Sequence, residues 1–134
     1  MGLDQYAIRV KQENIINDFE FKKGELLSET NTDTLGNDFG FCYWRNFRQL
    51  DFWALLLYCR KGGEGDFNCT YLRLDTGDLA ALYILAHEET FYEGGSFLDS
   101  NESREYEYKH LMEFIKKAKK AIQDGDAIYY SNCW

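Results

Sequence analysis

The side chains of this chain that could do chemistry are two histidines, a row of carboxylates, a glycine-rich turn and an aromatic group with an arginine. His87 precedes Glu88 and Glu89, and His110 stands apart from them. A helical metal site needs histidines at positions i and i+4, or more His and Cys nearby, and the sequence has neither. Acid–base catalysis by Glu88 or Glu89 would need a pocket that shifts a carboxylate pKa. We therefore expect no catalytic residues, no metal and no cofactor, and an enzyme using His87, Glu88 or Glu89 is the last of three hypotheses.

The glycine-rich segment Gly62-Gly63-Glu64-Gly65 could cradle a phosphate with its backbone N–H groups. Phosphate loops of this kind follow a strand and lead into Lys-Ser or Lys-Thr, and the sequence around these glycines offers neither. The segment is therefore predicted to be the turn that ends a helix.

Negative charge is concentrated in one window of the sequence. The chain carries 15 basic and 23 acidic residues, a net charge of −8, and seven of the acids lie between residues 88 and 107 with one base, Arg104. Such a surface repels nucleic acid and attracts basic partners. The alternative is a solvated helix start that serves solubility. The predicted partner-binding residues are Glu88, Glu89, Glu93, Asp99, Glu102, Glu105 and Glu107.

Aromatic residues gather in the middle of the chain, around an arginine. An arginine over an aromatic face can stack a base or hold an anion. A small-molecule site that sequesters a nucleotide signal, with Trp53 nearby, is therefore the second hypothesis. The alternative is core packing, with Arg45 bridging to an acid such as Asp4. The predicted ligand-pocket residues are Tyr43, Trp44, Arg45 and Trp134.

The four cysteines, at 42, 59, 69 and 133, have no C-x-x-C spacing. Without paired spacing a zinc site is not expected. The sequence has no apolar run of about 18 residues that could span a membrane. Its first residues also lack the basic region followed by an apolar region that a secretory signal has. We therefore expect a soluble cytoplasmic protein with four free thiols and no membrane contact.

The elements that position these residues are predicted to form one globular domain, residues 1–134, of α+β class. It would be a small, mostly antiparallel sheet covered by about three helices. One helix, 46–60, is apolar on nearly every side, so we expect a homodimer to cover it. Residues 22–38 are polar and predict a long loop. Alternation and periodicity predict strands at 3–10, 39–44, 69–74 and 127–134, and helices at 46–60, after a cap at Asp75 or Thr76, and over 108–122.

Three short motifs carry a family resemblance: Met1-Gly2-Leu3-Asp4, Tyr43-Trp44-Arg45, and Tyr129-Tyr130 followed by Trp134. Together they resemble a family of small uncharacterised phage proteins. That family usually has a histidine in the helix after Tyr-Trp-Arg, where this chain has Asp51, so any role of that histidine is lost or moved here. The resemblance implies a phage-encoded accessory protein in the cytoplasm of an infected host cell, and it implies no reaction.

The first hypothesis combines the acidic window with this resemblance. It is a phage-encoded, non-catalytic inhibitor that binds a host defence or nucleic-acid-handling protein, such as a CRISPR effector. Rows of carboxylates would occupy a basic channel built for phosphates, so the chain would mimic nucleic acid and not bind it directly. Charge complementarity would select the partner, and Tyr and Trp would supply the anchors.

Overall fold

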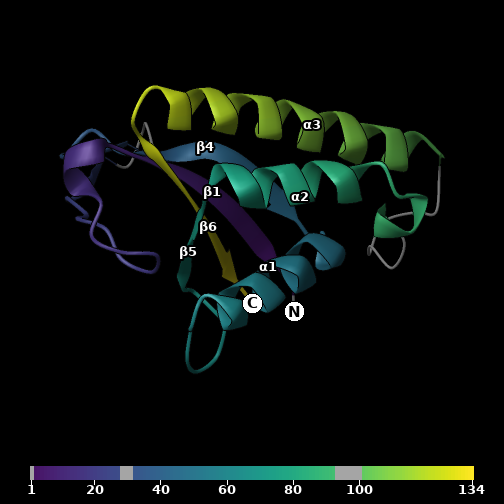
Figure 1. Cartoon of the computed structure of the whole chain (residues 1–134), viewed down its shortest axis with the longest axis horizontal. Helices are drawn as coiled ribbons and strands as arrows, with labels where there is room; N and C mark the ends of the chain where they lie inside the picture. Colours follow the sequence, from purple (N-terminus) through teal and green to yellow (C-terminus); the bar gives the residue numbers. More distant parts are fainter. Residues whose placement is uncertain (1, 28–31, 93–100) are drawn as a thin grey trace.

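A six-stranded sheet with helices over one face forms the body of the molecule (Figure 1). The computed structural model describes residues 2–27, 32–92 and 101–134. The strands are β1 (Asp4–Val10), β2 (Leu26–Leu27), β3 (Thr32–Asp33), β4 (Asp38–Arg45), β5 (Tyr71–Leu74) and β6 (Ala127–Cys133). The helices are α1 (Arg48–Arg60), α2 (Thr76–Ala86) and α3 (Asn101–Gln123), with the 3-10 turns η1 (Gln12–Asn14) and η2 (Glu89–Tyr92). The predicted α+β class is confirmed.

The sheet has the order β2-β3-β4-β1-β6-β5, and each neighbouring pair is antiparallel. β1 lies between β4 and β6, and its register with β6 pairs Asp4 with Cys133 and Val10 with Ala127. The two marked chain ends therefore lie side by side beneath α1 (Figure 1).

The two faces of β1 pack against different parts of the chain. Ala7 belongs to the main core, which α1, α2 and α3 cover, and α2 and α3 run side by side over it (Figure 1). Ile8 and Val10 point to the other face, where Phe21 covers them. The main core also contains Trp44, Leu50, Leu57, Leu72, Leu79, Leu82, Leu111, Phe114 and Ile128.

α1 begins two residues later than predicted because Asn46 has a left-handed backbone, φ 57°. Asparagine tolerates this conformation better than most residues. Here its side-chain Oδ1 accepts from the Leu3 N–H at 2.8 Å, so the turn is attached to β1. The predicted glycine end is confirmed. Gly62 has φ 97°, and the N–H of Gly63 donates to the Tyr58 carbonyl at 2.8 Å, as in a Schellman motif.

The prediction of a long loop at residues 22–38 was only partly right, because two short strands lie within the described part of that range. β2 pairs with β3 there, and Asp33 and Asn37 are buried. Asp33 accepts four hydrogen bonds, from the backbone of Gly24, Leu35 and Asn37 and from the Asn37 side chain. Two-residue strands leave no periodic pattern in a sequence, so this order was not predictable. Residues 28–31 lie outside the described residues.

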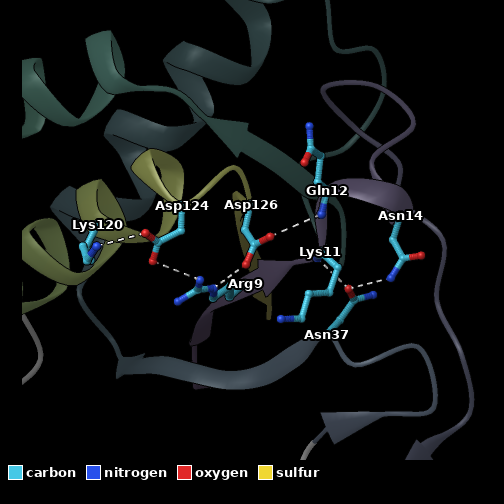
Figure 2. Close-up of polar contacts among 8 residues, drawn as sticks. All are labelled: Arg9, Lys11, Gln12, Asn14, Asn37, Lys120, Asp124 and Asp126. Carbon is cyan, nitrogen blue, oxygen red and sulfur yellow. Dashed lines mark hydrogen bonds and ion pairs between the residues drawn. The ribbon is translucent and has the colours of Figure 1, made fainter.

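Polar contacts attach the end of α3, and the turn after it, to β1 and to the segment that follows β1 (Figure 2). The Arg9 guanidinium lies 2.7 Å from Asp126 and 3.5 Å from Asp124, and Lys120 also reaches Asp124 at 2.9 Å. In the same view, Asn37 accepts hydrogen bonds from the Lys11 backbone and from the Asn14 side chain. These contacts are structural, because the carboxylates of Asp124 and Asp126 each meet a cation of the same chain.

The prediction of four free thiols was wrong. Cys69 and Cys133 form a disulfide, with Cα atoms 4.7 Å apart, and Cys42 and Cys59 are free. Sequence spacing cannot reveal such a pair, since the antiparallel pairing of β5 with β6 brings it together from 64 positions apart.

The apolar helix α1 is covered on one side by its own chain. Leu50, Ala54 and Leu57 are buried, whereas Phe52 and Leu56 are 57% and 49% exposed. The exposed pair lies on the side that the predicted homodimer would cover, and the homodimer stays a prediction.

Candidate functional site

Acidic side chains of the predicted partner-binding set gather where the end of α2 meets the start of α3. Glu88 follows α2, Glu89 opens η2, and Glu105 lies on α3. They border a depression of about 320 Å³, named here the acidic hollow, whose lining includes His87, Glu88, Glu89, Tyr92, Glu105 and Tyr108. Three further predicted residues are not placed at it: Glu93, Asp99 and the side chain of Glu102 lie outside the described part of the chain.

The wall that η2 contributes to the acidic hollow is anchored in the core. Phe91 is buried and packs against Phe47, with ring centroids 5.4 Å apart. The Tyr92 hydroxyl donates to the Ala86 carbonyl at 2.5 Å. Since burial fixes the backbone of this turn, the carboxylates beside it project from a rigid support.

His87 is fixed between two tyrosines at the edge of the acidic hollow. Its Nδ1 donates to the Tyr83 carbonyl at 2.8 Å, because a carbonyl oxygen can only accept. In the neutral ring, Nε2 is then the acceptor, and it faces the Tyr108 hydroxyl at 3.4 Å. Among the described residues, no three His, Cys, Asp or Glu side chains come together as a metal site would require.

Acidic side chains outnumber basic ones in the lining of the acidic hollow, which includes Glu88, Glu89 and Glu105 and one base, Arg104. The side chains of Glu88 and Glu89 are exposed, and neither forms an ion pair with another described residue. Glu105 lies 3.1 Å from Lys109, but both groups are well exposed and such a pair contributes little. A basic partner could therefore engage all three carboxylates.

Glu107 differs from the other predicted acids because it is half-buried. Burial raises the pKa of its carboxyl, and the neighbouring His110 partly opposes this shift. Its Oε2 is buried and has no hydrogen-bond partner among the described residues. Glu107 thus contributes less surface charge than its place in the sequence indicates.

The four residues of the predicted aromatic pocket do not come together. Trp44 is 3% exposed and packs against Phe114 in the core, with ring centroids 4.8 Å apart. Tyr43 and Arg45 point outward, and both contact Asp4, at 2.6 Å and 3.6 Å. The bridge from Arg45 to Asp4 is the alternative expected from the sequence.

Trp134 instead lines a different depression, which sequence reasoning missed. It has a volume of about 410 Å³ and is lined by Leu3, Arg48, Asp51 and Trp134, and we call it the polar pocket. It lies at the first turn of α1, beside the end of β6. The Trp134 side chain is 56% exposed, yet its indole N–H donates to the Phe67 carbonyl at 3.1 Å. The ring is therefore both open to solvent and held in one orientation.

Behind the polar pocket lies a buried hydrogen-bond network that fixes Asp51. Its Oδ1 accepts from the Tyr130 hydroxyl and from the Asn132 side-chain amide, both at 2.7 Å. The Gln5 amide donates to the Tyr130 hydroxyl at 2.9 Å, and its carbonyl accepts from the Phe47 N–H at 2.8 Å. Gln5, Tyr130 and Asn132 are each at most 1% exposed. The signal in the sequence was the pair of amide side chains, Gln5 and Asn132, within apolar strands.

A cysteine and a histidine also meet, but not as a nucleophile and base. Cys42 Sγ lies 3.5 Å from His110 Nε2, and that nitrogen donates to the Tyr43 carbonyl at 2.9 Å. A nitrogen that already carries a proton cannot take one from the thiol. Burial raises the pKa of Cys42 to about 11, so the thiol stays protonated at neutral pH.

This arrangement predicts slow alkylation of Cys42. At pH 8 a pKa of about 11 leaves roughly one thiolate in a thousand, and the thiolate is the reactive form. We expect iodoacetamide to label the exposed Cys59 first, and Cys42 to follow at least about tenfold more slowly. Peptide mass spectrometry of a time course measures both rates. Equal rates would show that Cys42 is neither buried nor shifted.

The described residues include no helix long and apolar enough to cross a membrane. Comparisons with protein-family models, with curated proteins and with solved structures gave no match. The site therefore stands on its own geometry.

Proposed function

We propose that this protein is a non-catalytic binding protein that docks its acidic hollow on a basic surface of another protein. The observation that carries the proposal is the set of exposed carboxylates of Glu88, Glu89 and Glu105 around one depression. Aligned charges of one sign accelerate encounter with a partner of opposite charge and reject partners of like charge.

Exposed apolar side chains on the last turns of α2, which leads into the acidic hollow, support the same proposal. Ile84 is 66% exposed, and Tyr83, whose ring contacts that of His87, is 46% exposed. Aromatic and aliphatic anchors surrounded by polar groups are typical of protein interfaces, where they supply most of the binding energy. The carboxylates would then select the partner, and these side chains would hold it.

The partner class that this proposal favours is a host protein that handles nucleic acid, such as a CRISPR effector or another defence protein. Its basic channel would receive the carboxylates in place of phosphates. The resemblance to small phage proteins supports this choice, and it makes the cytoplasm of an infected host cell the place of action. The protein would inhibit by occupying the channel and would not itself bind nucleic acid.

A charge reversal tests the proposal. We expect the unchanged chain to capture a basic host protein from bacterial lysate. The triple variant Glu88→Lys, Glu89→Lys, Glu105→Lys should no longer capture it. With the purified partner, we expect binding to weaken about 100-fold or more, since close interfacial charge pairs contribute about 1.5 kcal/mol or more each. Binding of the unchanged chain should also weaken as salt rises, because exposed charges are screened.

A matched variant separates local charge from net charge. Glu13→Lys, Glu20→Lys and Glu25→Lys make the same change at three exposed acids around η1 and after it, at the opposite end of the molecule in Figure 1 from η2. We expect this control to keep the partner. Circular dichroism of both variants checks the fold. Capture that survives the first variant, or is lost equally in both, would contradict docking at the acidic hollow.

A further inference from the structure

We propose that the polar pocket binds a guanine nucleotide, with the base on Asp51 and Trp134 and the phosphate toward Arg48. Among the described residues, none lines both the polar pocket and the acidic hollow. Its volume of about 410 Å³ lies within the range of small-molecule sites. The proposal is therefore independent of the protein-docking function, and either can fail alone.

The carboxylate of Asp51 determines which hydrogen-bonding groups a ligand must present. Its Oδ1 is already occupied by Tyr130 and Asn132, and Oδ2 has no hydrogen bond from any described residue. An ionised carboxylate only accepts, with about two sites on each oxygen. Two acceptor sites on Oδ2 thus remain for a ligand that presents two adjacent N–H donors.

Among the common bases, guanine alone presents two adjacent donors, N1–H and the 2-amino group, on its Watson–Crick edge. Adenine and cytosine would place an unprotonated ring nitrogen beside the carboxylate, and uracil would place carbonyl oxygens there. An acceptor facing an acceptor loses its hydrogen bond and leaves a polar group unsatisfied. The chemistry of Asp51 therefore favours guanine.

Trp134 supplies a surface on which a flat base can stack. Its side chain is 56% exposed, its indole N–H is bonded to the Phe67 carbonyl, and its backbone N–H donates to the Asn68 side chain at 2.9 Å. The adjacent Cys69–Cys133 disulfide holds the same end of β6 against the start of β5. A ring fixed in this way loses little freedom when a ligand arrives, which favours binding.

Arg48 distinguishes a nucleotide from other ligands with paired N–H donors. A guanidinium ligand would also suit Asp51 and stack on Trp134, but the positive charge of Arg48 beside it opposes a cation. A phosphate instead gains a charge-assisted contact with Arg48.

Calorimetry with the purified chain tests the ligand without any substitution. We expect GMP to bind in the micromolar range. IMP lacks the 2-amino donor, so we expect it to bind at least roughly tenfold more weakly than GMP. AMP would place its unprotonated ring nitrogen against the carboxylate, so we expect it to bind about 100-fold more weakly than GMP. Guanosine, without the phosphate, should also bind more weakly than GMP. Free arginine measures the guanidinium alternative. Equal binding of GMP and AMP, stronger binding of arginine than of GMP, or no GMP binding at 1 mM would overturn the proposal.

Asp51→Asn separates a role of Asp51 in ligand binding from a purely structural role. The new amide oxygen can still accept from Tyr130 and Asn132, whereas its N–H now faces the pocket as a donor. We therefore expect this variant to lose GMP, because its N–H groups would face the N1–H and 2-amino donors of the base. The control Asp66→Asn removes the same charge from an exposed position and should leave GMP binding unchanged.

Trp134→Ala gives a second readout that does not depend on the buried network, because this side chain is exposed. We expect GMP binding to weaken roughly tenfold or more, as loss of base stacking does elsewhere. A folded Trp134→Ala that binds GMP normally, or a folded Asp51→Asn that binds GMP as tightly as the unchanged chain does, would overturn the proposed site.

Discussion

Leu57→Ala is expected to lower the free energy of unfolding by about 2–5 kcal/mol, as large-to-small changes in a packed core do. Leu57 is 4% exposed and lies in the main core, between the sheet and the helical layer. Removing its side-chain atoms forfeits their transfer from water and leaves a cavity that the rigid neighbours fill only in part. Urea denaturation followed by circular dichroism gives the change.

Leu56→Ala is the matched control for this prediction. It makes the same substitution one position earlier on the same helix, where the side chain is 49% exposed. Leucine and alanine are both good helix formers, so intrinsic propensity does not separate the two variants. We expect a change within about 0.5 kcal/mol. Equal losses at both positions would mean that another surface covers Leu56, as the predicted homodimer would.

Reduction of the Cys69–Cys133 disulfide is expected to lower the free energy of unfolding by about 4 kcal/mol. The bond joins residues 64 positions apart, and closing a loop of this length removes much of the conformational entropy of the unfolded chain. Denaturation midpoints with and without reductant measure the effect. The variant Cys59→Ser should change little, since Cys59 is exposed and free.

Thiol counting gives the direct check of the same bond. Alkylation of the unfolded protein without reductant should add two labels, at Cys42 and Cys59, and four after reduction. Four labels without reductant would restore the expectation of free thiols. A full count of two with no loss of stability on reduction would show instead that the unfolded chain is already restricted near these residues.

Local patterns predicted the long elements of the fold well. The apolar stripe of α3 places Leu111, Ile115 and Ala118 in the core, as its spacing of three and four indicates. The cap of α2 is also as predicted, since Asp75 and Asp78 form a capping box. Tyr83 of the same helix is 46% exposed and packs its ring against that of His87, so an apolar residue in a helix is not necessarily part of the core.

The sequence by itself determined the class of fold, the acidic window, the start of α2 and the ends of α1 and α3, because each depends on neighbours along the chain. Tertiary structure decided which distant residues meet. Gln5, Asp51 and Tyr130 belong to β1, α1 and β6, and they share one network because β1 and β6 pair in a fixed register behind the first turn of α1. Strand register and helix docking are set by the total packing of the core, which no local spacing encodes. For the same reason the sequence grouped Trp134 with Tyr43, Trp44 and Arg45, whereas in the structure it lines the polar pocket with Leu3, Arg48 and Asp51.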